Sequence, residues 1–233
     1  MKMKISAPAL KYVVDAASRL LDEGVMEFRA DGMRIREMDA SQIAMVDAFV
    51  PRKSFLEYPE FPTEGSDVVE KHGVNLKLMK QMVGKADEDI TLEVVENKLV
   101  MAFGKKEFKM GLLDLQHNIR KVPKVENAAE FAIAPADFFG WLGDVSVASS
   151  HITFKTKEGK LRAVGTGDSG EVDDETGLTC EQEIEAIYPI GFLGKMKLSG
   201  DMKFYVKTNT PIRLSYLFDG ISVDYLLAPR ITS

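Results

Sequence analysis

The sequence is short of the residues that hold metals and disulfides. Its 233 residues include a single cysteine, Cys180, and only three histidines. One thiol cannot build a disulfide framework or a zinc cage, and Cys180 has no basic neighbour, so we expect an inert thiol. His72, His117 and His151 are isolated, with no carboxylate or cysteine at metal-ligand spacing. The sequence therefore predicts neither a metal site nor a cofactor.

Long apolar runs are absent as well. No stretch of about 18 apolar residues occurs, so no helix is expected to span a membrane. The N-terminus, Met1–Ser6, turns polar too early for a signal peptide. A lone thiol suits a reducing interior, so we expect the protein in the cytoplasm, or in the nucleus if the source has one.

The composition is that of a globular protein. Apolar residues make up 45% of the chain and charged residues 28%, which is enough for a core. The length permits one large domain or two of ordinary size. The net charge of −6 argues against a uniformly basic surface for nucleic acid. Lysines confined to one face could still give an acidic chain a local basic surface.

Apolar residues at helical spacing predict four helices. The first begins after Ser6, which can cap it, and is expected to stop at Gly24. The second is short, is capped by Asn75 and ends at Gly84. The predicted helices are Ala7–Asp22, Leu76–Val83, Ala136–Val147 and Pro189–Leu198.

Alternating or β-branched segments predict strands between these helices. Asp31-Gly32 marks a tight turn between the first two. The predicted strands are Val25–Arg29, Gly32–Glu37, Ile43–Phe49, Thr91–Val95, Lys98–Phe103, Lys106–Leu115, Met202–Lys207, Ile212–Phe218 and Ser222–Leu227, with a further strand ending at Phe154.

The chain repeats itself after about half its length. Ala134-Pro135-Ala136 follows Ala7-Pro8-Ala9 by 127 residues, and Gly159 follows Gly32 by the same distance. Each copy reads helix, strands, helix, strands, which predicts a duplicated α+β domain. The polar stretch 116–127 contains a proline and has neither period, so we interpret it as a linker. The predicted division is a domain at 1–115, a linker at 116–127 and a domain at 128–233.

The sequence offers no catalytic pattern. Gly165–Gly170 has the spacing G-x-G-x-x-G, but the acidic run Glu171–Glu175 follows it and would repel a phosphate. A glycine-rich hairpin turn is the simpler interpretation. No G-K-[S/T] loop is present, and no acid/base pair stands out. We therefore expect a protein that is not an enzyme.

Three segments carry a resemblance to a known family. The C-terminal part reads Tyr-Leu-Leu-Ala-Pro-Arg-Ile at 225–231, the first half contains Glu-Met-Asp-Ala-Ser-Gln-Ile-Ala-Met-Val-Asp at 37–47, and the second helix opens Gly-Val-Asn-Leu at 73–76. In this order they resemble proliferating cell nuclear antigen, the DNA sliding clamp, and most closely its archaeal members. The resemblance covers essentially the whole chain.

The resemblance implies a fold, an assembly and partners. The expected DNA-clamp fold has two duplicated domains, each with antiparallel sheets and two helices, and three identical subunits close into a ring. Duplex DNA passes through the ring without sequence specificity. DNA polymerase, the clamp loader, flap endonuclease and DNA ligase dock on the outer face through short peptides. The expected function is that of a processivity factor in DNA replication and repair.

The resemblance also implies that helices line the hole of the ring. Basic residues on the predicted helices fit this arrangement. Such side chains would contact phosphates without reading bases, as a sliding ring requires. Asp15 and Asp22 share the first helix face, so the attraction should be modest. The third helix departs from the family, because it lacks Lys and Arg and carries Asp137 and Asp144. The residues expected to face DNA are Lys11, Arg19, Lys77, Lys80, Lys195 and Lys197.

Two further surfaces follow from the resemblance. The client-peptide pocket maps onto Met38, Gln42, Ile43, Met45, Val122, Pro123, Pro211, Leu226, Ala228 and Pro229. The linker beside it is basic, through Arg120, Lys121 and Lys124. The subunit interface maps onto Lys85, Lys105, Lys106, Lys109, Asp144, Glu171, Asp173, Asp174 and Glu175, where opposite charges on two strands would select the partner.

Two alternatives remain at this point. The chain could be one subunit of a heterotrimeric clamp. It could also be a monomeric α+β enzyme or binding module built from the same two halves.

Overall fold

The computed structural model describes residues 1–61, 70–115, 121–168 and 170–231. The chain divides into two compact units. Unit 1 comprises Met1–Ala40, Val46–Lys121 and Asp219–Val223, and unit 2 comprises Ser41–Met45, Val122–Phe218 and Asp224–Ser233. The linker and domain limits predicted above stay a prediction, and residues 116–120 of that linker lie outside the described residues.

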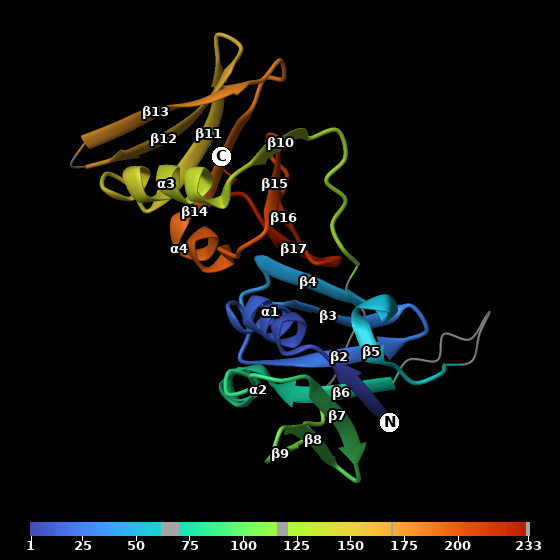
Figure 1. The fold of residues 1–233 in the computed structure, drawn as a ribbon. Coiled ribbons are helices and arrows are strands. Elements are labelled where there is room, and N and C mark those ends of the chain that lie inside the picture. Colours follow the sequence, from blue (N-terminus) through green and yellow to red (C-terminus); the bar gives the residue numbers. More distant parts are fainter. Residues whose placement is uncertain (62–69, 116–120, 169, 232–233) are drawn as a thin grey trace. The chain divides into compact units, whose positions relative to one another are not determined.

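Unit 1 contains the N-terminal elements of Figure 1. In chain order they are β1 (Lys2–Ile5), α1 (Ala7–Ser18), β2 (Glu23–Arg29), β3 (Gly32–Met38), β4 (Ala44–Pro51), the 3₁₀ turn η1 (Arg52–Ser54), β5 (Phe55–Glu57), β6 (Glu70–Asn75), α2 (Leu76–Val83), β7 (Ile90–Val95), β8 (Lys98–Phe103) and β9 (Lys106–Gly111). One set of strands follows the order β5-β1-β7-β8-β9, and the other follows β4-β3-β2-β6.

Unit 2 contains the corresponding C-terminal elements. They are β10 (Ala129–Ile133), α3 (Pro135–Ser146), β11 (His151–Lys157), β12 (Lys160–Gly167), β13 (Gly170–Thr179), β14 (Glu185–Pro189), α4 (Ile190–Leu193), η2 (Gly194–Met196), β15 (Asp201–Val206), β16 (Ile212–Phe218) and β17 (Ile221–Leu227). Their strand orders are β10-β15-β16-β17 and β13-β12-β11-β14. These match β1-β7-β8-β9 and β4-β3-β2-β6 of unit 1, so the predicted duplication is confirmed.

Helix α1 begins where the sequence predicts and ends earlier. Ser6 caps it, because its hydroxyl accepts a hydrogen bond from the Ala9 N–H at 3.4 Å. The predicted end at Asp22 is wrong, since the helix stops at Ser18. Glu23 and Gly24 instead pair with β6 as the start of β2. A Cβ on Gly24 would lie 3.0 Å from Leu76, so this glycine serves close packing of the strand on α2 rather than a helix stop.

Helix α2 matches its prediction from cap to end. The Asn75 side chain accepts from the Leu78 N–H at 2.8 Å, and Gly84 is the residue after the last turn. Leu76, Met79 and Val83 are buried, which leaves the lysine side of this amphipathic helix toward solvent.

Two other predicted elements are too long. The strand predicted at Lys106–Leu115 ends at Gly111, because Leu113 instead forms a β-bridge with Gly73 of β6. The helix predicted at Pro189–Leu198 is one turn, α4, followed by the 3₁₀ turn η2. Gly191 and Gly194 weaken this segment as an α-helix, since glycine has a low helix propensity.

The three glycines of the 165–170 motif lie in a hairpin, as predicted. Gly167 pairs with Gly170 at its end, and strand β13 follows instead of a helix. A dinucleotide site needs that helix, so its absence after this described hairpin removes the motif from consideration.

Each unit has its own core. In unit 1 the apolar side of α1, with Leu10, Val13 and Val14, is fully buried. In unit 2 the rings of Phe138, Phe154 and Phe204 cluster with centroids 5.3–5.8 Å apart. Among the described residues, no helix is long and apolar enough to cross a membrane.

Candidate functional site

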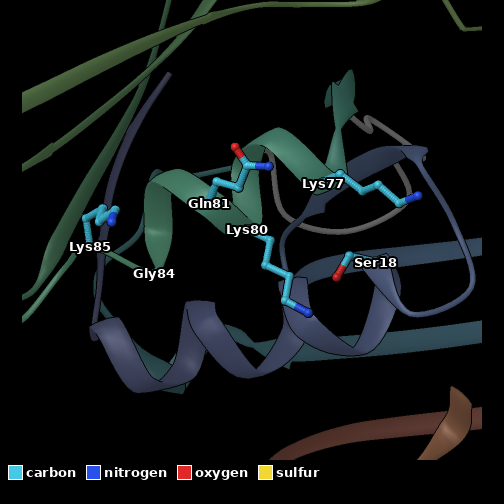
Figure 2. A pocket seen from close by; sticks show the side chains of 6 residues that line it. All are labelled: Ser18, Lys77, Lys80, Gln81, Gly84 and Lys85. Carbon is cyan, nitrogen blue, oxygen red and sulfur yellow. The ribbon is translucent and has the colours of Figure 1, made fainter.

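Helices α1 and α2 of unit 1 lie beside one another and expose polar sides (Figure 2). Between them an open cavity of about 700 Å³ is lined by Ser18, Lys77, Lys80, Gln81, Gly84 and Lys85. Two of the residues predicted to face DNA, Lys77 and Lys80, therefore line one cavity. Lys85, which was predicted for the subunit interface, lines the same cavity.

Asp15 forms ion pairs with two of the predicted DNA-facing cations, Arg19 and Lys80. Its Oδ2 accepts from Arg19 Nε at 2.9 Å and Nη2 at 2.8 Å, and its Oδ1 lies 2.6 Å from Lys80 Nζ. Burial alone would raise the pKa of Asp15, but the hydrogen bonds from Lys80 and Arg19 outweigh it and lower that pKa below its ordinary value. Asp15 is therefore ionised and ties the end of α1 to α2.

The other two predicted cations of unit 1 also have partners. Lys77 Nζ lies 2.6 Å from Asp22 Oδ1, and both side chains are well exposed. Lys11 Nζ donates to the Ala86 carbonyl at 2.5 Å, just beyond the end of α2. The basic helix face is thus interleaved with carboxylates and a carbonyl.

In unit 2 the predicted cations sit on aromatic rings. Lys195, in η2, lies 5.2 Å from the ring centroid of Phe192, and Lys197 lies 5.4 Å from that of Phe139 on α3. These are cation–π distances. Helix α3 has no Lys or Arg of its own, so Lys197, the residue after η2, brings a positive charge to it.

The two strands predicted to join subunits are both edge strands. β9 ends the strand order of one sheet in unit 1, and β13 ends that of the four-stranded sheet in unit 2. An edge strand presents unpaired backbone N–H and C=O groups that another strand can take up. The two strands are therefore suited to receive a further strand.

The predicted interface lysines do not share one face of β9. Side chains alternate along a strand, so Lys106 lies on the side of Phe108 and buried Met110. Lys109 lies on the opposite side with Glu107, whose carboxylate is 2.9 Å away. Lys105 is in the turn before the strand.

The acidic residues of β13 are likewise divided between two faces. Glu171, Asp173 and Glu175 alternate with Asp174, which shares its side with Val172 and Thr176. Thr176 and Leu178, on the Asp174 side, line a cavity of about 390 Å³ with Trp141 and with Asp144, a predicted interface residue on α3.

Two basic residues of β12 form ion pairs with the β13 face that carries Asp173 and Glu175. They were not identified from the sequence. Arg162 donates to Asp173 at 2.5 Å, and Lys160 lies 2.5 Å from Glu175. The hydrogen bond from Arg162 lowers the pKa of Asp173, and that from Lys160 lowers the pKa of Glu175. The signal in the sequence was the β12–β13 hairpin, whose register places Arg162 opposite Glu175.

The residues predicted for the client pocket lie mostly in unit 2. The Ala228 N–H donates to the Ile43 carbonyl at 2.8 Å, which fixes the C-terminal strand end against the 41–45 segment. Ile43 is 36% exposed, and Gln42 beside it has a left-handed backbone with φ 59°. Pro123 is exposed, and Val122, Pro211, Ala228 and Pro229 are half-buried.

Met45 and Leu226 do not offer open surface. Each is only 2% exposed, so the expectation that their side chains form an accessible pocket floor does not fit this structure. Each lies in a run of three buried strand residues, Ala44–Val46 and Tyr225–Leu227, so both sides of the strand are covered there. Met38 is half-buried and belongs to unit 1. Arg120 of the basic linker lies outside the described residues, whereas Lys121 and Lys124 are exposed.

No group of three or more histidine, cysteine or acidic side chains that could hold a metal ion occurs in the described part of the chain. Cys180 is buried, and its thiol donates to the Gln182 carbonyl at 3.4 Å.

Comparison with known proteins gives a consistent result. The chain is 28% identical to a DNA polymerase sliding clamp of Methanococcus maripaludis, with 96% of each chain covered. Its fold matches the A. fulgidus PCNA solved with the C-terminal region of FEN-1 bound (TM-score 0.84, 22% identity, 100% and 99% covered). It also matches a chain of the PCNA2–PCNA3 complex of Sulfolobus tokodaii (TM-score 0.76, 24% identity, 99% and 99% covered). No protein-family model matches.

The predicted resemblance and fold are thereby confirmed. The chain is similar to the PCNA-type sliding clamps along its whole length, and it has the DNA-clamp fold. Sliding clamps are a non-catalytic class of protein, and the chain is accordingly not an enzyme.

Proposed function

We propose that three copies of this sliding clamp for DNA polymerase close into a ring around duplex DNA. The ring keeps the polymerase on its template and recruits the clamp loader, flap endonuclease and DNA ligase. The observation that carries the proposal is the basic face of α1 and α2, with Lys77 and Lys80 on one cavity, in a chain of clamp fold. Cations placed on helix surfaces suit phosphate contacts that read no sequence.

The edge strands supply the ring closure. β9 of one subunit pairs with β13 of the next, which satisfies the open backbone groups of both. In this pairing the side of β9 that carries buried Met110 continues into the side of β13 that carries Val172 and Thr176. Lys106 and Asp174 then lie on the same face of the joined sheet, and Lys109 and Glu171 lie together on the opposite face. Opposite charges on each side favour this pairing over self-pairing of either strand.

The client peptide docks in unit 2 beside Ile43 and Pro229. The complex of A. fulgidus PCNA with the C-terminal region of FEN-1 supports a peptide-binding role for this fold. The exposed Ile43 side chain offers apolar contact. Lys121 and Lys124 flank the predicted pocket residues Val122 and Pro123 in the chain and favour peptides with acidic flanks.

A heterotrimeric clamp is the second candidate. The match to the PCNA2–PCNA3 complex favours it, because that assembly joins different clamp chains. Charge on both edges of the same chain favours the homotrimer, since Lys106 and Asp174 complement each other without a second gene product.

One experiment tests ring formation and DNA retention together. The molar mass of the purified chain is measured by light scattering, and we expect three times the chain mass of 25.9 kDa. The protein is then placed on nicked circular plasmid with a clamp loader and ATP, and co-elution is followed before and after the plasmid is linearised. We expect retention on the circle and release from linear DNA. A monomer by mass favours the heterotrimer, and equal retention on both DNA forms overturns the ring.

A further inference from the structure

We infer that Asp15 and Asp22 are built-in counterions that compete with DNA phosphates for the cations of α1 and α2. This inference rests on the proposed function, because it concerns the strength of phosphate contact at the same helix face. Asp15 and Asp22 would keep Lys77, Lys80 and Arg19 from holding any one phosphate firmly.

The geometry at Asp15 engages two cations with one carboxylate. Both of its oxygens are used, one by Lys80 at 2.6 Å and the other by the Arg19 fork at 2.8 and 2.9 Å. The Asp15 side chain is 29% exposed and that of Lys80 is 51% exposed, so solvent and DNA can reach the lysine while it stays paired. A phosphate that binds Lys80 must therefore displace or share this carboxylate.

The geometry at Asp22 engages one cation in a more open setting. Lys77 and Asp22 meet at 2.6 Å with side chains 60% and 74% exposed. A phosphate can replace Asp22 as the partner of Lys77 without any charged group being buried or exposed. The two aspartates thus differ in a way that can be measured, because Asp15 serves two cations and Asp22 serves one.

Paired cations attract DNA less than unpaired ones. At distances well beyond the 2.6 Å between its two charged atoms, an ion pair presents its summed charge rather than that of the lysine alone. At contact, carboxylate and phosphate oxygens are similar acceptors for an ammonium or guanidinium group. Each cation can therefore pass between the protein carboxylate and a phosphate. This makes the strength of phosphate contact similar at every position along the duplex, which favours sliding of the protein on DNA.

The test measures binding to a short linear duplex of mixed sequence by fluorescence anisotropy over a range of salt concentrations. Asp15→Asn and Asp22→Asn remove the charge but keep the shape and an acceptor oxygen. Each additional cation that neutralises a phosphate steepens the plot of log affinity against log salt by roughly 0.9. We expect both variants to bind more tightly at low salt, and the slope change for Asp15→Asn to be about twice that for Asp22→Asn.

Asp89→Asn is the matched control. It makes the same change in net charge and breaks an ion pair of unit 1, Lys4 with Asp89 at 3.7 Å, that lies on neither α1 nor α2. Thermal unfolding of each variant is followed in parallel. Asp22 is so exposed that its substitution leaves the fold intact, so the test stands even if Asp15→Asn proves unstable.

The outcomes separate this inference from the ring itself. If both Asp15→Asn and Asp22→Asn exceed Asp89→Asn in affinity and slope, the counterion role is supported. If they equal Asp89→Asn, the change is one of net charge and the inference is overturned, even when wild-type protein is retained on circular plasmid. If wild-type protein is not retained on the circle but the two variants still exceed the control, the ring proposal fails and the counterion role stands.

Discussion

Lys80 Nζ and Asp15 Oδ1 lie 2.6 Å apart and join α2 to α1 across the basic face of unit 1. The contact is not a simple surface pair, because Arg19 holds the second oxygen of the same carboxylate. It therefore affects both the stability of the helix pair and the charge that this helix face presents to solvent.

The Asp15 contacts predict an acid-sensitive contribution to stability. Burial opposes the charge of Asp15, but hydrogen bonds from Lys80 and Arg19 lower its pKa below the ordinary 3.8. A depressed pKa stabilises the fold above the unfolded value, and this stabilisation is lost as pH falls through the folded value. We expect Asp15→Asn to lower the free energy of unfolding at pH 7 by up to about 1 kcal/mol. Urea unfolding at pH 7 and toward the acid limit checks this, and a difference that stays constant in acid would contradict an ion-pair origin.

The sequence predicts what is decided locally. The caps at Ser6 and Asn75 depend on neighbours three residues away, and both are found where expected. The end of α1 depends on a strand about fifty residues further on, because Glu23 leaves the helix path to pair with Asn75. No periodicity within residues 7–22 carries that information.

The candidate sites show the same limit. The lysines of α1 and α2 were found because an amphipathic helix reveals its polar side. The partners of Asp173 and Glu175 were missed, because they depend on the β12–β13 register. The burial of Met45 and Leu226 was missed for a similar reason, since an apolar residue on a strand does not reveal whether its face is covered.

Gly73 is predicted to be required for the backbone bridge to Leu113. A Cβ at this position would lie 2.3 Å from the Leu113 carbonyl oxygen, well inside van der Waals contact. Gly73→Ala should therefore destabilise unit 1 by roughly 1–3 kcal/mol. Gly111→Ala is the control, because a Cβ there would meet nothing within 4 Å. Chemical denaturation measures both, and equal stabilities would show that the backbone relaxes around the bridge.

The two faces of β9 predict which charge reversals rescue one another. Lys109→Glu should weaken the trimer, because like charges then meet on the outer side of the β9–β13 joint. Glu171→Lys in the same chain should restore assembly, since it lies on the matching side of β13. Asp174→Lys lies on the other side and should not restore it, whereas it should rescue Lys106→Glu.

Light scattering at low salt measures the mass of these single and double variants. Low salt is needed because surface charges are screened beyond about 10 Å at 0.1 M. If either acidic-to-lysine substitution on β13 restored the trimer of either β9 variant, net charge alone would govern assembly. An unchanged trimer in the Lys109→Glu single variant would place the joint on other strands.

Ile43 gives the sharpest test of the client surface. A client peptide with a glutamine, a spaced aliphatic residue and paired aromatic residues should bind beside the 41–45 segment, because aromatic anchors need an apolar surface. Ile43 is 36% exposed, so Ile43→Asp alters this surface without burying a charge in the core, as Met45→Asp would. An unpaired carboxylate beneath the aromatic rings should cost on the order of 2 kcal/mol, which lowers affinity at least about tenfold. Val95→Asp is the control, since Val95 is similarly exposed at 46% but lies on β7 of unit 1. Calorimetry measures peptide binding, with the mass of each variant checked in parallel, and a trimeric Ile43→Asp protein that binds as well as Val95→Asp would place the client pocket elsewhere.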